Sequence, residues 1–125
     1  MVTHPPNVSA FHVPLVARNP RDEDRTTPPI EVLVDTGSEL SWLPRTVLEQ
    51  IGVVPRRWYR FATATGELVS REVGYAILSA QGFETNDDVV FAAPGDAPLL
   101  GTIEGFGVTV DDIGHRFIAR TMLAV

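Results

Sequence analysis

The sequence of 125 residues contains no cysteine and no lysine. Without cysteine there can be no disulfide, thiol nucleophile or thiolate metal site. Without lysine there can be no Schiff base and no phosphate-binding P-loop, since both need that amine. The 10 basic residues are therefore all arginines, and 16 acidic residues outnumber them to give a formal net charge of -6. Because an acidic chain repels phosphate, we expect no nucleic-acid partner.

Long apolar runs and metal-ligand spacing are also missing. No stretch approaches the roughly 20 apolar residues of a membrane span, so we expect no membrane partner. The start of the chain has no charged segment followed by an apolar one, so no signal peptide is expected. Together with the absence of cysteine, this favours the cytoplasm. His4, His12 and His115 are scattered without ligand spacing, so no metal and no cofactor are expected.

A hydrophobic fraction of 44% is typical of a globular protein, and the length suits one domain, residues 1–125, with a single core. Residues 18–29 are charged, hold three prolines and lack apolar periodicity, so we predict an exposed loop there. Pro14 indicates an edge position in the strand expected before that loop.

Short β-branched and apolar runs separated by turn residues dominate the rest of the chain. We predict strands at residues 9–17, 30–34, 58–62, 68–78, 88–92, 108–110 and 117–119. Turns are expected at 63–67 and 81–86, a helix at 45–52 with Pro44 before it and Gly52 at its end, and a single helical turn at 102–105. Several strands at such short spacing indicate an all-β barrel or sandwich.

Asp35-Thr36-Gly37-Ser38 is the segment that best fits a reactive site, since it places a carboxylate directly after an apolar strand. Gly37 lets backbone N–H groups approach that carboxylate, and Thr36 and Ser38 add hydroxyls. Taken alone, the tetrapeptide also fits a plain turn that ends a strand, in which Asp35 bonds its own backbone.

The neighbouring residues extend the motif. The segment from Val34 to Pro44 resembles the active-site segment of retropepsin-like aspartic proteases, and Leu99-Leu100-Gly101 resembles the second signature of that family. Residues 63–67 lie where the family has its flap, and 105–111 resemble the end of its bacterial members. The resemblance implies a single-domain closed β-barrel with a flap hairpin and one or two short helices, which acts as a homodimer.

The resemblance also implies a function, an aspartic endopeptidase that cleaves peptide or protein substrates without metal or cofactor. Asp35, Thr36 and Gly37 would be catalytic, and Ser38, Thr65 and Gly66 would contact substrate. Because the chain carries a single Asp-Thr-Gly, one copy supplies half of the catalytic pair, and a symmetric homodimer supplies the rest. Thr36 would then bond across the axis. A Ser38 hydroxyl bonded to the carboxylate would lower its pKa and make the pH optimum more acidic.

Two other functions follow from the same residues. A noncatalytic dimeric module of this fold could bind an extended peptide by strand addition without cutting it. A phosphoaspartate enzyme of the haloacid-dehalogenase type would need an acid two residues after Asp35, where Gly37 stands. Trp42, Trp58 and Tyr59 are interpreted as packing residues, although each could face a substrate cleft.

Overall fold

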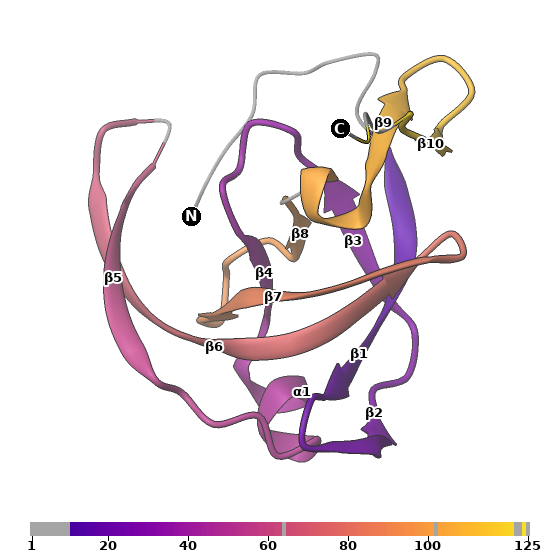
Figure 1. Ribbon diagram of the computed structural model, residues 1–125. Helices are drawn as coiled ribbons and strands as arrows, with labels where there is room; N and C mark the ends of the chain where they lie inside the picture. Colours follow the sequence, from indigo (N-terminus) through magenta and orange to yellow (C-terminus); the bar gives the residue numbers. More distant parts are fainter. Residues whose placement is uncertain (1–10, 64, 102, 122–123, 125) are drawn as a thin grey trace.

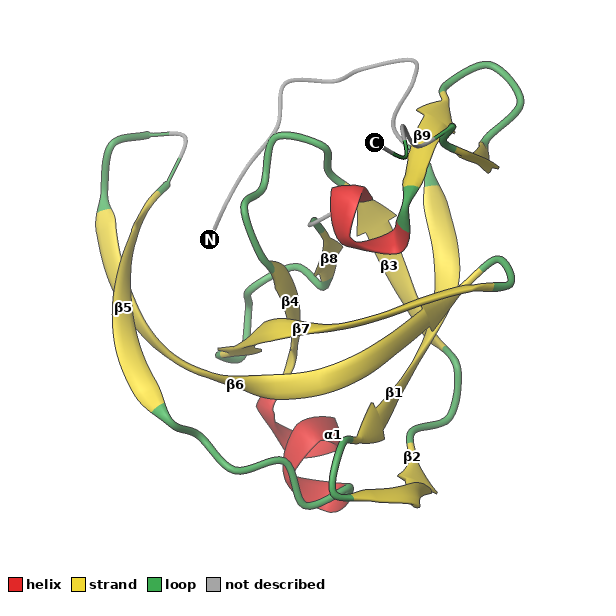
Figure 2. Ribbon diagram, viewed as in Figure 1, coloured by secondary structure: helices red, strands yellow, loops and turns green. Residues whose placement is uncertain are grey.

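The computed structural model describes residues 11–63, 65–101, 103–121 and 124, and within them the chain is mostly β-strand (Figures 1 and 2). The strands are β1 (His12–Asn19), β2 (Asp22–Thr26), β3 (Ile30–Val34), β4 (Ser41–Pro44), β5 (Arg57–Ala62), β6 (Leu68–Ala80), β7 (Phe83–Ala92), β8 (Leu99–Leu100), β9 (Val108–Asp111) and β10 (Arg116–Ala119). The helices are α1 (Arg45–Gln50) and the 3-10 helix η1 (Ile103–Phe106). The all-β class and the two short helices predicted from the sequence are therefore confirmed.

One sheet joins eight of these strands in the order β2-β1-β3-β8-β4-β7-β6-β5. β1 also pairs with β6, through Val16–Arg18 against Ile77–Ser79. β6 pairs with β7 over Val73–Ala80 and with β5 over Leu68–Val73. The first part of β6, Leu68–Val73, therefore leaves the core together with β5 as a two-stranded hairpin, which rises at the left of Figure 1.

Two apolar clusters fill the interior. The larger one includes Val13, Leu15 and Ala17, the inward-facing residues of β1, where side chains alternate as a half-buried strand requires. The smaller cluster holds Trp42, Val73, Val90, Ala92 and Leu99, and Phe61 and Val69 of the hairpin pack against it. The smaller cluster therefore contacts the hairpin near its tip, because Phe61 and Val69 form the pair next to the last one, Ala62 with Leu68.

The predicted helix and the predicted edge position of Pro14 agree with the structure. Pro44 directly precedes α1, Gly52 follows it with φ +79°, and Leu48 is buried. At Pro14, β1 pairs with β3 alone, because β6 begins to pair at Val16. The missing N–H of Pro14 therefore leaves no ladder bond unmade. Within the described residues, neither helix is long or apolar enough to cross a bilayer.

The prediction of an exposed loop at 18–29 is wrong for residues 22–26, which form β2, and for the exposure of Asn19 and Thr27, which are buried. β1 continues to Asn19, and β2 pairs antiparallel with it through Asn19 opposite Asp22 and Arg18 opposite Thr26. All five residues of β2 are exposed. A strand at a sheet edge with both faces in solvent buries no apolar residues, so it lacks the alternation that identifies strands in a sequence. The predicted strand began at Ser9, and residues 9–10 lie outside the described part of the chain.

The turn predicted at 81–86 is also shorter than expected. Ala80 pairs with Phe83, so Gln81 and Gly82 alone connect β6 to β7. Their φ values of +51° and +82° are those of a two-residue hairpin turn of type I′. Glu84 and Asn86 lie in β7 with exposed side chains, and these polar residues hid the first half of the strand.

Candidate active site

Asp35 lies where β3 leaves the core, and its side chain is buried at 3% exposure. The Asp35 N–H donates to the Leu100 carbonyl at 2.9 Å, and the Val34 N–H donates to the Phe11 carbonyl at 2.9 Å. The backbone on both sides of the carboxylate is thus fixed by neighbouring segments. A buried carboxylate in a rigid backbone is the arrangement that an acid–base site needs.

The turn after Asp35 is closed by its own backbone. The Gly37 N–H donates to Asp35 Oδ1 at 3.0 Å, and the Ser38 N–H donates to the Asp35 carbonyl at 3.1 Å. A Cβ at residue 37 would lie 3.4 Å from Asp35 Oδ1, so glycine adds no side chain on this side of the carboxylate. We call residues 35–38 the acid turn. Its geometry combines the plain turn foreseen from the tetrapeptide with a buried carboxylate that accepts the Gly37 N–H.

Ser38 does not make the hydrogen bond expected of it. Its hydroxyl donates to the Leu40 carbonyl at 2.6 Å. A serine hydroxyl has one proton, and that proton is used within the turn rather than on the Asp35 carboxylate. The expectation of a more acidic pH optimum caused by Ser38 therefore loses its physical basis. The role of Ser38 in this structure is to brace the acid turn.

The two signatures that are 66 residues apart in the sequence meet at the acid turn. β8 lies between β3 and β4, parallel to β3 through Val34 opposite Leu100 and antiparallel to β4 through Trp42 opposite Leu99. A Cβ at Gly101 would lie 2.6 Å from the Ser38 carbonyl oxygen and 2.7 Å from that of Leu40. Only glycine allows this approach, so Gly101 packs directly against the backbone that follows Asp35.

Ser41 is a supporting residue that the sequence interpretation missed. It is fully buried, and its hydroxyl accepts a hydrogen bond from the Gly101 N–H at 3.1 Å. This bond links β4 to the residue that packs on the acid turn. The signal was present, because a serine among Leu40, Trp42 and Leu43 in a buried strand needs a hydrogen-bond partner.

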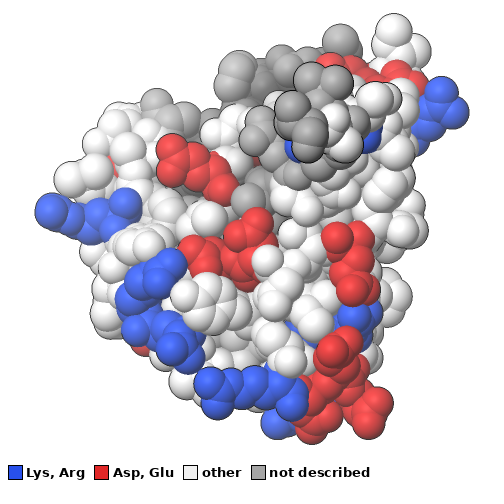
Figure 3. All heavy atoms as spheres, in the orientation of Figure 1, with Lys and Arg blue, Asp and Glu red and all other residues white. Residues whose placement is uncertain are grey.

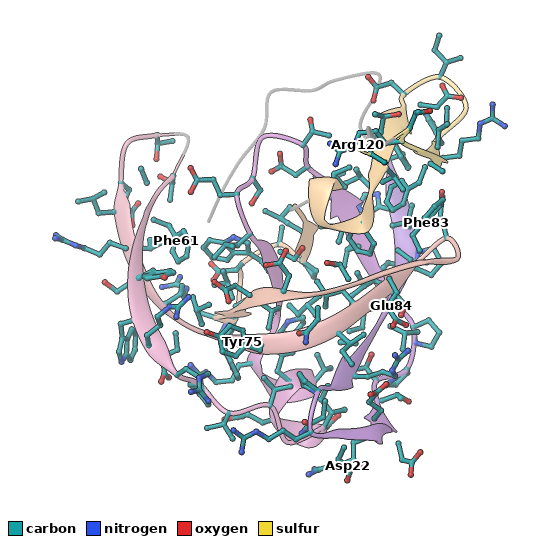
Figure 4. All side chains as sticks on the ribbon, in the orientation of Figure 1. Asp22, Phe61, Tyr75, Phe83, Glu84 and Arg120 are labelled. Carbon is teal, nitrogen blue, oxygen red and sulfur yellow. The ribbon has the colours of Figure 1, made fainter. Side chains whose placement is uncertain are left out.

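A hollow of about 280 Å³ separates the acid turn from the β5–β6 hairpin. We call it the turn–hairpin hollow, and its lining residues are Gly37, Ser38, Glu39, Leu40, Trp42, Arg60, Phe61 and Ala62. Trp42 and Phe61 meet edge to face with ring centroids 5.0 Å apart, and Figure 4 shows Phe61 on the β4 side of β5. Trp42 is buried as predicted, and it also forms part of this hollow.

Thr65 and Gly66, the predicted substrate contacts of the hairpin, lie at its exposed tip. The Gly66 N–H donates to the Thr63 carbonyl at 2.9 Å, and the Thr63 N–H donates to the Glu67 carbonyl at 2.8 Å. Gly66 has φ +85°, which explains the glycine at that position. The hairpin side of the hollow is formed by residues 60–62. Trp58 and Tyr59 do not line it either, and Trp58 is 65% exposed.

A second pair of supporting residues, Arg71 and Asp96, ties the hairpin to the loop that leads into β8. Arg71 Nε lies 2.8 Å from Asp96 Oδ2, and Arg71 NH2 lies 3.2 Å from Oδ1. Burial opposes ionisation of this carboxyl, but the hydrogen bonds from Arg71 and the Ala93 N–H outweigh burial and lower the pKa of Asp96. Nothing in the sequence pairs these residues, since 25 positions separate them.

Thr36 lies toward the other side of the acid turn. Thr36 is exposed, and a hollow of about 530 Å³ lies beside it. We call this the outer hollow, and it is lined by residues 36–39 together with Ile103, Thr109 and Val110. The acid turn is therefore open to the turn–hairpin hollow on one side and to the outer hollow on the other.

Metal ligands do not gather in the part of the chain that the structure describes, where no three His, Asp or Glu side chains are placed to hold an ion. His12 is exposed, and the His115 ring stacks on Phe11 with centroids 4.9 Å apart. The groups that the acid turn itself offers are the Asp35 carboxylate, its backbone N–H groups and the hydroxyls of Thr36 and Ser38.

Comparison with known proteins agrees with this geometry. No curated protein gives a significant match to the sequence. A family model described as aspartyl protease matches residues 24–103, which include the acid turn, the hairpin and β8. The matched span covers more than half of the chain, and the chain therefore belongs to the retropepsin-like aspartyl protease family.

Proposed function

We propose that the protein is an aspartic endopeptidase whose catalytic pair consists of Asp35 from each of two copies in a homodimer. The observation that carries this proposal is the acid turn, where a buried carboxylate accepts the Gly37 N–H and β8 braces the backbone. A peptide bond is the substrate that membership of this family favours. We also propose that the pairing of β1 with β6 closes the sheet into a barrel.

The dimer follows from the chemistry. Two carboxylates in close contact cannot both ionise, so they share one proton and titrate in two separated steps, the behaviour typical of aspartic proteases. The ionised Asp35 takes a proton from water, and the protonated one donates a hydrogen bond to the substrate carbonyl. Water adds to that carbonyl carbon to give a gem-diol. Proton transfer to the amide nitrogen then releases the amine and the carboxylic acid.

The remaining site residues have roles in the same arrangement. Thr36 is exposed beside the outer hollow, where it can bond to the second copy. Gly37 donates its N–H to the carboxylate and places no side chain beside it, and Ser38 holds the turn. The β5–β6 hairpin would close over an extended peptide in the turn–hairpin hollow as a flap, with Thr65 and Gly66 at its tip. Because its tip holds a glycine, backbone groups there can approach the peptide.

Mixing wild-type protein with an Asp35→Asn variant tests the shared pair. We expect Asp35→Asn alone to lower kcat/KM on a cleavable peptide by roughly 10²–10⁴-fold, because it removes the acid–base group. In an equal mixture with exchanging subunits, about one quarter of dimers keep both carboxylates, so activity should fall with the square of the wild-type fraction.

The matched control is Asp22→Asn, which removes the same charge from exposed β2 at the opposite end of the molecule (Figure 4). It should leave the activity unchanged. A linear dependence on the wild-type fraction would show that one copy suffices. A dimer that binds peptides and cleaves none of them would instead favour the noncatalytic peptide-binding module.

A further inference from the structure

Arginine side chains gather at the lower left of Figure 3, along β5 and toward the end of the molecule that holds α1. This contrasts with the net charge of -6 for the whole chain. Arg21 and Arg56, which directly precede β2 and β5, line a hollow of about 360 Å³ together with Asn19, Pro20, Val53, Val54 and Tyr75. We call it the arginine hollow. None of its lining residues belongs to the acid turn or to the β5–β6 hairpin tip.

The two arginines that line this hollow form no ion pair within the described part of the chain. Arg57, the neighbour of Arg56, pairs with Asp88 at 2.9 Å. Arg21 and Arg56 have no carboxylate within 4.0 Å among the described residues. Two guanidinium groups that share one concave site in this way attract an oxyanion, since each offers a planar set of donors to phosphate or carboxylate.

The walls of the arginine hollow are held by the fold. Asn19 is buried, its amide donates to the Ile51 carbonyl at 2.9 Å, and its side-chain oxygen accepts the Arg21 N–H at 2.8 Å. The Arg56 N–H donates to the Val73 carbonyl at 2.9 Å. The backbones that carry both arginines are therefore fixed, and only their side chains adjust to a ligand. Such preorganisation lowers the entropic cost of binding.

Tyr75 and Val54 add an aromatic ring with a hydroxyl and an apolar surface to the hollow. The Arg56 guanidinium lies over the Tyr75 ring, 5.4 Å from its centroid. The Tyr75 hydroxyl accepts a bond from Arg57 NH1 at 3.3 Å, so its own proton remains available to donate. Val54 is 67% exposed, which leaves an apolar surface beside the charged one. A volume of this size is within the range of small-ligand sites.

We propose that the arginine hollow binds a small oxyanion ligand, in which a phosphate or carboxylate group pairs with Arg21 and Arg56 and an attached apolar or aromatic body lies against Val54. The Tyr75 hydroxyl donates a further hydrogen bond to the oxyanion. The same chemistry is found in a free aromatic phosphate and in a phosphotyrosine side chain. The site is separate from the acid turn, so it stands whether or not the protein cleaves peptides.

Titration of the ¹⁵N-labelled protein with phenyl phosphate, followed by amide chemical shifts, tests the proposal. We expect saturable shifts confined to the amides of the lining residues and their neighbours, which are those of Asn19, Arg21, Val53, Val54, Arg56 and Tyr75. Arg56→Gln should weaken binding by about tenfold or more, which is the usual effect of losing a charge-assisted hydrogen bond. Val54→Ser should weaken phenyl phosphate more than inorganic phosphate, because only the former has an apolar body. A phosphotyrosine peptide that binds tighter than phenyl phosphate would identify a polypeptide as the source.

The matched control is Arg120→Gln, which removes the same charge near β9 and β10, far from Tyr75 in Figure 4. It should leave the affinity unchanged. Equal weakening by Arg120→Gln and Arg56→Gln, or shifts spread over the whole molecule, would overturn the proposal in favour of general charge attraction. An absence of saturable shifts at millimolar phenyl phosphate would also overturn it. Arg56 is exposed, so its substitution should leave the fold intact. Amide shifts that stay unchanged elsewhere in the protein will show that each variant is folded.

Discussion

The acid turn and the β5–β6 hairpin face each other across one hollow and are held in opposite ways. The acid turn is fixed by backbone hydrogen bonds from Val34 and Asp35 to the Phe11 and Leu100 carbonyls and by two bonds within the turn, and Gly101 packs against it. The outer part of the hairpin bonds mainly to itself, with Trp58 and Leu68 exposed at 65% and 61%. Its ties to the body include the Phe61–Trp42 contact, the Arg71–Asp96 pair, and the ion pairs of Glu72 with Arg45 and of Arg57 with Asp88.

This difference indicates that the acid turn is rigid and that the β5–β6 hairpin is able to move. Local opening is easiest where few apolar contacts are lost, so the hairpin should open at far lower free energy than the acid turn. A reacting carboxylate needs a fixed position, whereas an extended substrate needs a wall that moves aside to admit it. Substitutions that weaken one side at a time should therefore separate the two regions.

Gly101→Ala should have the largest effect on stability, because residue 101 packs against the rigid acid turn. The new Cβ would lie 2.6 and 2.7 Å from two carbonyl oxygens of the backbone after Asp35, and backbone cannot move aside as a flexible side chain does. We expect a loss of about 3 kcal/mol in the free energy of unfolding, measured by urea denaturation. Peptide cleavage should be lost even at temperatures where the variant is folded.

Gly66→Ala at the hairpin tip is the matched control for this substitution. No atom lies within 4 Å of the added Cβ, and only the φ of +85° opposes alanine there. A cost of about 1 kcal/mol is expected. Equal destabilisation by the two variants would contradict the contrast between a rigid turn and a yielding hairpin.

Phe61→Ala should have the second largest effect and should act on the hairpin. Phe61 is half-buried against the smaller apolar cluster and meets Trp42 edge to face. Its truncation should cost about 2 kcal/mol through lost burial and the lost ring pair. Hydrogen exchange should accelerate most at the amides of β5 and of Leu68–Val73 in β6.

Exchange at β3 reports whether that loss is local. Amides of residues 30–34 should accelerate only in proportion to the global loss of stability. If β3 and β5 accelerate by the same factor at low denaturant, the hairpin and the acid turn open as one unit, and the comparison fails.

Asp96→Asn should have the smallest effect, and that effect depends on pH. The lowered pKa of Asp96 means that its charged form stabilises the fold. This contribution is present above the ordinary pKa of an aspartate and is lost as the pH falls through the lowered value. We expect Asp96→Asn to cost about 1 kcal/mol near neutral pH and progressively less as the solution becomes more acidic.

The exposed pair between Arg116 and Asp111 provides the comparison for that variant. The N–H of Gly114 and the bond from Arg116 lower the pKa of Asp111, so Asp111→Asn shares the direction of the pH dependence. It should leave hydrogen exchange of the β5–β6 hairpin unchanged, whereas Asp96→Asn should accelerate it. The same acceleration in both variants would show that the Arg71–Asp96 pair does not hold the hairpin.

The sequence predicts the acid turn far better than its surroundings. Asp35, Gly37 and the Leu99–Gly101 signature act through backbone geometry that specific residue types require. Their pattern is therefore visible in the chain. The all-β class also follows from the short apolar runs, since alternating burial leaves a mark on each strand.

Features that depend on which residues the fold brings into contact could not be predicted from the sequence. The Ser38 hydroxyl had several acceptors within reach, and only the folded turn selects the Leu40 carbonyl. β2 carries no apolar alternation because both its faces are exposed. The Arg71–Asp96 pair and the arginine hollow each join segments that are distant in the chain, and charge alone does not identify such neighbours.

The position of β8 between β3 and β4 has a consequence for the synthesis of the chain. Asp35 and its turn leave the ribosome early, but the strand that holds them, residues 99–100, follows more than sixty residues later. Long-range pairing of this kind forms slowly and cannot begin before both partners exist. A nascent chain that ends before Gly101 therefore has its acidic residue without the packing that fixes it. The packing around Asp35 is thus completed only after translation has passed that point.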